Sequence, residues 1–101
     1  MTNEYKSLYK LTDTLRFKFR DYVDQPNDPV AVELHRGVDQ LAEAVEMSKN
    51  PHTLEDLAKR LIEELHHIAS QPLTIMDLRH LTDLREQLEH IRDNIHRLSN
   101  Y

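Results

Sequence analysis

Hydrophobic residues recur along the chain at spacings of three and four, and prolines divide this pattern into four segments. Such a spacing places side chains on one face of an α-helix. Proline inside a helix removes a backbone hydrogen bond and clashes with the preceding turn, at a cost of about 3 kcal/mol. The prolines, Pro26, Pro29, Pro51 and Pro72, should therefore lie between helices. The pattern predicts four amphipathic helices, over about 4–24, 29–49, 54–70 and 75–99.

Each predicted helix has an apolar face that should point into a common core. The expected core positions are Tyr5, Leu8, Leu15, Phe19 and Tyr22, broadened by Leu11, Phe17 and Val23; Val30, Leu34, Val38, Leu41 and Val45; Leu54, Leu57, Leu61, Leu65 and Ile68, with Ala58 and Ile62; and Leu81, Leu84, Leu88, Ile91, Ile95 and Leu98. The last set resembles the seam of a coiled coil. It is expected to cover the other three helices, whereas a coiled coil between two copies of the chain is the alternative.

Local signals mark several helix ends and one close contact. Asp28 stands before Pro29 as a helix cap, and Thr53 with Asp56 forms an approximate capping box that Thr74 and Asp77 repeat. The only glycine, Gly37, lies in the middle of the second predicted helix, where glycine costs up to about 1 kcal/mol relative to alanine. Close approach of a neighbouring helix would compensate for that cost.

The connections between the predicted helices are short, so successive helices should run antiparallel. The fold expected is all-α, an antiparallel up-down-up-down four-helix bundle that forms one domain over residues 1–101. A chain of 101 residues is long enough to bury such a core without disulfides or metals.

Composition and charge narrow the classes of function. Hydrophobic residues make up 39% and charged residues 31%, which is typical of a globular protein, and no apolar run reaches the roughly 20 residues that cross a bilayer. The start of the chain lacks a signal peptide, so a cytoplasmic location is expected. The net charge of −5 makes nucleic acid a poor partner, and the absence of cysteine excludes thiolate chemistry.

Two Glu-x-x-His pairs, Glu63 with His66 and Glu64 with His67, match the spacing of carboxylate-bridged di-iron bundles. Such a site needs these side chains inside the core, with further inward glutamates. The helical pattern instead turns them toward or near solvent. We therefore expect no metal. The two histidines also lack the following Lys and Gly of a phosphotransfer site.

Arg85 and His90 have the Arg-x4-His spacing of helical HEPN ribonucleases. On an ideal helix, however, their side chains point about 140° apart. An Arg85–Glu89 surface pair and an exposed His90 are expected instead. Glycine-rich loops and nucleophilic triads are also missing, so neither an enzyme nor a cofactor site is expected.

Basic and aromatic residues alternate near the start of the chain. They are Lys6, Tyr9, Lys10, Arg16, Phe17, Lys18, Phe19 and Arg20. This composition suits nucleic acid or an anionic membrane surface. Core aromatics flanked by Lys and Arg whose charged ends reach solvent explain it better, and are the expectation.

The stretch Asn50-Pro51-His52-Thr53-Leu54, which leads through Leu61 and 68–70 to Thr74 and Leu81, resembles the immunity proteins that protect lactic-acid bacteria from pediocin-like bacteriocins of the enterocin A type. The ending 94–101 is also similar. Those proteins are cysteine-poor four-helix bundles of about this length. Many of them are basic, whereas this chain is acidic, which speaks against a role at a membrane surface.

The resemblance implies a non-enzymatic cytosolic protein that recognises the bacteriocin-engaged sugar-transport permease of the mannose phosphotransferase system. Its specificity would lie in the C-terminal half, for which we take Arg92, His96, Arg97 and Tyr101 as partner-binding candidates. The alternative is a small helical adaptor, antitoxin or phage-type inhibitor that binds a soluble protein through the first and last predicted helices, 4–24 and 75–99. Either protein is expected to be a monomer or a homodimer.

Overall fold

The computed structural model describes residues 2–71 and 75–98. They form four helices: α1 (Asn3–Tyr22), α2 (Pro29–Glu46), α3 (Pro51–Ala69) and α4 (Leu78–Leu98). No strand occurs in these two ranges, so the all-α prediction is confirmed. None of the described helices is both long and apolar enough to cross a membrane.

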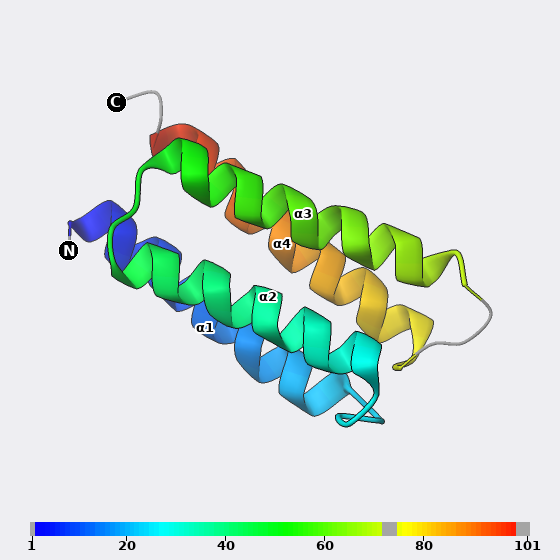
Figure 1. Cartoon of the computed structure of the whole chain (residues 1–101). Coiled ribbons are helices and arrows are strands. Elements are labelled where there is room, and N and C mark those ends of the chain that lie inside the picture. The colour runs from blue at the N-terminus through cyan, green and yellow to red at the C-terminus, as the bar shows by residue number, and fades with distance from the viewer. Residues whose placement is uncertain (1, 72–74, 99–101) are drawn as a thin grey trace.

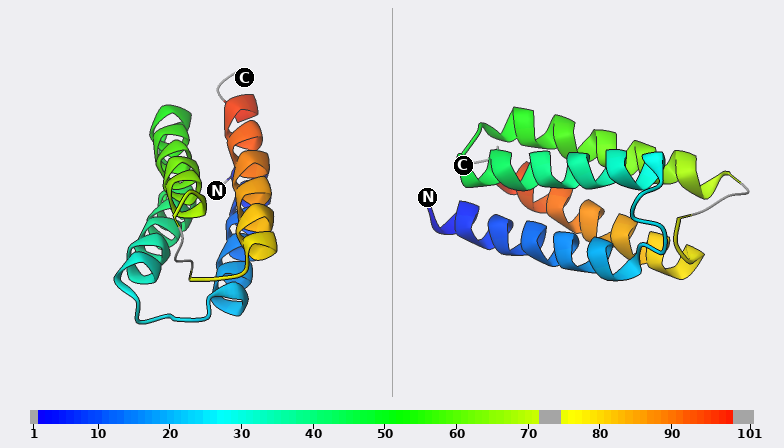
Figure 2. Two further views of the ribbon diagram at one scale, coloured as in Figure 1. Left: turned by 90° about the vertical axis from the view of Figure 1, so that its right-hand side faces the viewer. Right: turned by 60° about the horizontal axis from the view of Figure 1, so that its bottom comes forward.

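The helices pack in a ring in chain order. α1 contacts α2 and α4, and α3 contacts α2 and α4. The left view of Figure 2 shows the resulting two pairs, α2 beside α3 and α1 beside α4. The start of α1, the end of α4 and the connection from α2 to α3 lie at one end of the bundle (Figure 1). The connection from α1 to α2, the end of α3 and the start of α4 lie at the other end, and the longest extent is 42 Å.

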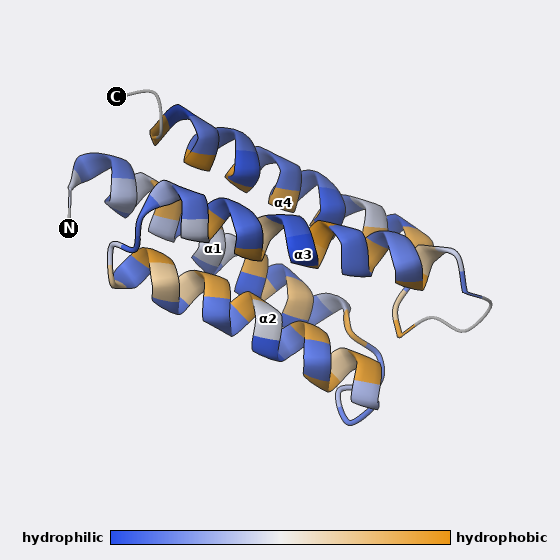
Figure 3. Cartoon of the chain, turned by 45° about the horizontal axis from the view of Figure 1, so that its top comes forward, coloured by the Kyte–Doolittle hydropathy of each residue, from blue (hydrophilic) through white to orange (hydrophobic). Residues whose placement is uncertain are grey.

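The core lies where the apolar faces of the helices meet, and Figure 3 shows hydrophobic residues of α4 on the side facing the other helices. Most predicted core positions are buried. Phe17 and Val30 are corrections, with 62% and 43% of their surfaces exposed. Phe17 precedes Phe19 by two residues, which places their side chains about 160° apart around a helix, so the two rings cannot share a face. Val30 lies in the first turn of α2 and lines a surface hollow.

Several buried residues were not expected in the core. Ala31, Ala42, Ile75 and Met76 are buried, the last two in the connection before α4. Thr12 is fully buried, and its hydroxyl donates a hydrogen bond to the carbonyl oxygen of Tyr9 at 2.7 Å. Because Thr12 is polar, the pattern of apolar positions does not include it.

Gly37 provides the close approach that the sequence suggested. A Cβ atom built on it would lie 2.6 Å from Cδ2 of Leu61, closer than real Cβ contacts. Leu61 is 97% buried. The missing side chain therefore lets α2 and α3 pack together, which offsets the weak helix preference of glycine.

The first two helices end earlier than predicted. α1 ends at Tyr22 because Val23 adopts an extended conformation. α2 ends at Glu46, three residues before the prediction, because Ser48 is left-handed with φ 54°. The amide of Ser48 donates to the carbonyl of Val45, and that of Lys49 to the carbonyl of Ala44. This is the Schellman arrangement, which usually has glycine at the left-handed position.

The last two helices begin elsewhere than predicted. α3 begins at Pro51 because the Asn50 side chain accepts a hydrogen bond from the Thr53 amide at 2.9 Å, so the predicted Thr53–Asp56 capping box is wrong. α4 begins at Leu78. The carboxylate of Asp77 accepts a hydrogen bond from the Arg79 amide at 2.9 Å, which lowers the pKa of Asp77. Thr74, the other half of the second predicted box, lies outside the described residues.

Candidate partner-binding surface

Phe17 lies on the solvent-facing side of α1 with an arginine over its ring. The guanidinium carbon of Arg20 lies 5.9 Å from the ring centroid. Such a cation–π contact is worth about 0.5–1 kcal/mol at an exposed site. Even with this contact, 62% of the surface of Phe17 is exposed.

A hollow of about 390 Å³ adjoins this pair between α1 and α2. It is lined by Phe19, Arg20, Val23, Pro26, Ala31, Val32 and His35. Val32 is 44% exposed. Arg20 joins the hollow to Phe17, and we call Phe17, Arg20, Val32 and this hollow the α1–α2 surface.

His35 borders the hollow on the α2 side. Its ring centroid lies 5.9 Å from that of Phe19, and its Nδ1 atom lies 3.2 Å from Oδ2 of Asp39. The ring is thereby held between a buried aromatic residue and a carboxylate. One rim of the hollow is polar, as in small-molecule and protein-binding clefts where a few polar groups orient an apolar contact.

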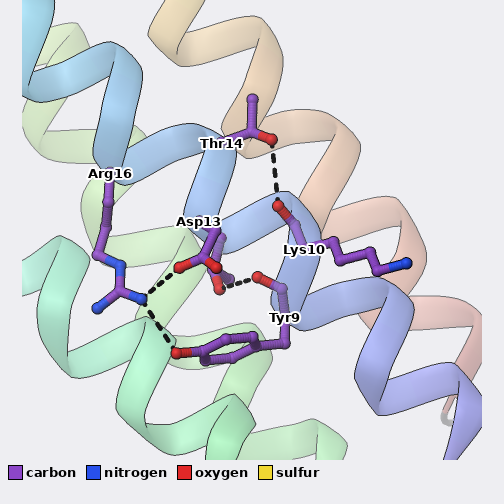
Figure 4. A network of polar contacts seen from close by, with 6 residues as sticks. Tyr9, Lys10, Asp13, Thr14 and Arg16 are labelled. Carbon is purple, nitrogen blue, oxygen red and sulfur yellow. Dashed lines mark hydrogen bonds and ion pairs between the residues drawn. The ribbon is translucent and has the colours of Figure 1, made fainter.

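The remaining basic residues of this stretch are partly used within the protein. Figure 4 shows Arg16 donating hydrogen bonds to Asp13 and to the hydroxyl of Tyr9, the latter at 3.1 Å. The bond to Asp13 is the main cause that raises the pKa of Arg16. Lys18 pairs with Asp83 of α4 at 3.2 Å. The core interpretation of the aromatic residues is thus confirmed for Phe19 and wrong for Phe17.

A second polar cluster joins α1 to α4. The hydroxyl of Tyr22 donates to the carboxylate of Asp83, and its ring stacks on that of His80 with the centroids 4.1 Å apart. The bond from Tyr22 and that from Lys18 lower the pKa of Asp83, and the same Asp83 bond raises the pKa of Tyr22. All four side chains are at least partly exposed. The cluster acts as a polar link between two helices that no connection joins directly.

The predicted C-terminal candidates do not form one group in the structure. Arg92 is half-buried, whereas His96 and Arg97 are exposed. Nδ1 of His96 lies 3.9 Å from a carboxylate oxygen of Glu55 on α3. Tyr101 lies outside the described residues. Their role in binding a partner stays a prediction.

The histidine motifs point outward. Glu63, His66 and His67 are exposed and Glu64 is half-buried. His67 contacts Gln71 at 3.2 Å. No group of three or more His, Asp or Glu side chains suited to a metal occurs in residues 2–71 and 75–98.

Arg85 contacts α3 and not Glu89, which corrects the expected surface pair. One of its terminal nitrogens lies 3.4 Å from Nδ1 of His66. His90 is exposed, as expected. The interior of the bundle is also filled, because the void bordered by Leu15, Phe19 and other core residues measures about 10 Å³, at the lower limit of the space that one water molecule needs. The larger hollows therefore lie at the surface.

Comparisons with known proteins gave no match: no family model matches the chain, and searches of curated proteins and of solved structures returned no significant similarity. No relative carries a function over to this chain.

Proposed function

We propose that this chain is a non-enzymatic protein that acts by binding another protein through the α1–α2 surface. The observation that carries the proposal is the 62% exposure of Phe17 beside Arg20 and an apolar hollow of about 390 Å³. Aromatic residues and arginine dominate the binding energy of protein interfaces, and they do so where a pocket accepts an anchor from the partner. Exposing a phenylalanine ring to water is otherwise unfavourable.

The specific form of the proposal is immunity-type protection in the cytoplasm of a bacteriocin-producing cell, by binding a bacteriocin-engaged sugar-transport permease. It rests on the resemblance in residues 50–81 and 94–101. It takes the chain as an antiparallel up-down-up-down bundle, which the short connections and the positions of the helix ends support. Arg92, His96, Arg97 and Tyr101 remain its candidates for specificity.

Expression in a bacteriocin-sensitive strain tests the immunity form. Survival should rise with the wild-type chain and return to the level of the empty vector with Phe17→Ala. Leu78→Ala is the matched control, because Leu78 is 60% exposed but lines a different hollow, between α3 and α4. Unchanged killing in the presence of well-expressed wild-type chain would rule out the immunity form.

Site-specific crosslinking tests protein binding without assuming that form. A photoreactive phenylalanine analogue at position 17 should give a discrete crosslinked product in the host cell, and the same analogue at position 78 should not. Arg20→Ala should weaken the product from position 17. Equal labelling from both positions would show that the α1–α2 surface is not the binding surface.

A further inference from the structure

A groove with paired charges runs along the junction of α2 and α3, on another side of the bundle from Phe17. It consists of two hollows of about 320 and 440 Å³. Both are lined by Glu33 of α2 and Glu64 of α3, so the two hollows are continuous. This shared lining makes one groove along the two helices.

The charges follow a fixed order in the groove. Arg36 and Arg60 line only the first hollow, beside the Gly37–Leu61 contact. The two glutamates come next, and Val30 lines only the second hollow. Each step of the order has one charge from each helix, so the groove carries an arginine pair next to a glutamate pair.

These charges lack partners within the described chain. None of the two arginines and two glutamates forms an ion pair within 4.0 Å in residues 2–71 and 75–98. Burial and the nearby charge of Glu33 raise the pKa of Glu64. Glu33 and Glu64 thus lie close enough for their like charges to repel each other across the groove. An occupant that brings basic groups to the glutamates and carboxylates to the arginines would relieve this repulsion and pair all four charges.

A second copy of the chain offers those charges in the required order. We infer that two copies associate through their α2–α3 grooves about a two-fold axis that passes between the arginine pair and the glutamate pair. Under this symmetry, Arg36 and Arg60 of each copy face Glu33 and Glu64 of the other. An interface of this kind is self-complementary, since every contact occurs twice.

Apolar contacts fit the same arrangement. Val30, which is 43% exposed, lies on the far side of the glutamate pair from the arginines. Gln40 and Leu57 line the opposite end of the groove. The two-fold axis brings the Val30 end of one copy's groove to the end lined by Gln40 and Leu57 of the other. The inference is independent of the proposed function, because it leaves Phe17 uncovered in both copies.

Sedimentation velocity over a concentration series is the first test. The mass should rise with concentration from the 12.0 kDa of one chain toward twice that value. It should fall back as salt is added, because salt reduces the Debye length from about 8 Å at physiological ionic strength to about 3 Å at 1 M and so screens the charge pairs. A wild-type chain that stays monomeric at millimolar concentration would overturn the inference.

Charge reversal tests the symmetry itself. The variant Arg36→Glu/Arg60→Glu and the variant Glu33→Lys/Glu64→Lys should each be monomeric, because each has like charges across the axis. Mixed in equal amounts, they should form a one-to-one heterodimer. The matched control is Glu43→Lys/Lys59→Glu, which reverses exposed charges on the same two helices outside the groove lining and should dimerise normally.

Circular dichroism should show that each variant keeps the helical content of the wild type. If folded reversal variants still dimerise alone, or if their mixture stays monomeric, the charge pairing is refuted. Neither result affects the crosslinking test at Phe17. Failure of the dimer and failure of the proposed function are therefore separate outcomes.

Discussion

Gly37 offers the sharpest test of how α2 and α3 pack. Replacing it by alanine has two opposing effects. Alanine is the better helix former, which stabilises the fold by about 0.5–1 kcal/mol. The new Cβ atom would lie 2.6 Å from Cδ2 of Leu61 and 3.5 Å from its Cγ atom, so the leucine must move.

The position of Leu61 decides which effect is larger. Its side chain is 97% buried, so rotation displaces core neighbours, and overpacking of this kind costs about 1–3 kcal/mol. The adjoining surface hollow gives the leucine one way to yield, which favours the lower part of that range. After subtraction of the helix gain of about 0.5–1 kcal/mol, we expect Gly37→Ala to destabilise the protein by up to about 1 kcal/mol, a fall in Tm of at most about 4–8 °C for a chain of this size.

A double-mutant cycle separates the two effects. In Leu61→Ala the clashing atom is gone, and Gly37→Ala should then stabilise the protein by about 0.5–1 kcal/mol relative to the single variant. Urea unfolding followed by circular dichroism gives the four free energies. Leu61→Ala alone should cost about 2–5 kcal/mol. Leu61→Val, which also lacks the Cδ atoms, serves as a milder background.

The exposed Glu43 of α2 supplies the control, because Glu43→Ala and Glu43→Gly measure the helix preference without a tertiary contact. If Gly37→Ala changes stability by the same amount with Leu61 and with alanine at position 61, the close contact does not limit packing. The explanation for the glycine would then be wrong.

Three further predictions concern helix ends and a polar cluster. Ser48→Gly should stabilise the protein by about 1 kcal/mol in urea unfolding, because glycine adopts the left-handed conformation without the cost that serine incurs. Asn50→Ala should destabilise it by about 1 kcal/mol, since the first turn of α3 loses its cap, whereas Asn50→Asp should be nearly neutral. The bonds from Tyr22 and Lys18 lower the pKa of Asp83, so their contribution is present at neutral pH and is lost as pH falls below the ordinary value of about 4. The difference in unfolding free energy between wild type and Asp83→Asn should accordingly shrink on acidification, and a difference that stays constant down to pH 2 would contradict the assignment.

The helices could be predicted from the sequence because their signals are local. Proline is disfavoured inside helices, and leucines at spacings of three and four define one face of a helix. The helix ends were less accurate. Asn50 and Thr53 are both good caps, and Pro51, which suits the first position of a helix, was the signal that favours Asn50. Nothing local marks Ser48 as left-handed, because serine rarely adopts that conformation.

The candidate surfaces were harder to predict because they depend on which helices are neighbours. The exposure of Phe17 was available from the sequence, since a residue two positions from the buried Phe19 must point away from it. The sequence did not show that Glu33 lies near Glu64, or that Tyr22 binds Asp83. Such pairs require the order of the helices around the bundle and their axial offset, which a single sequence does not specify.

The ring order of the helices has a consequence for how the chain folds and opens. Three of the four interfaces join helices that follow each other in the chain, whereas the α1–α4 interface joins its two ends. Closing that interface costs the most loop entropy, so it should form late in folding and open first in native-state hydrogen exchange. The Tyr22–Asp83, Lys18–Asp83 and Gln87–Leu11 bonds all cross this interface. These bonds join two helices that no connection links directly. Removing one of them should therefore raise the unfolding rate before it changes other properties.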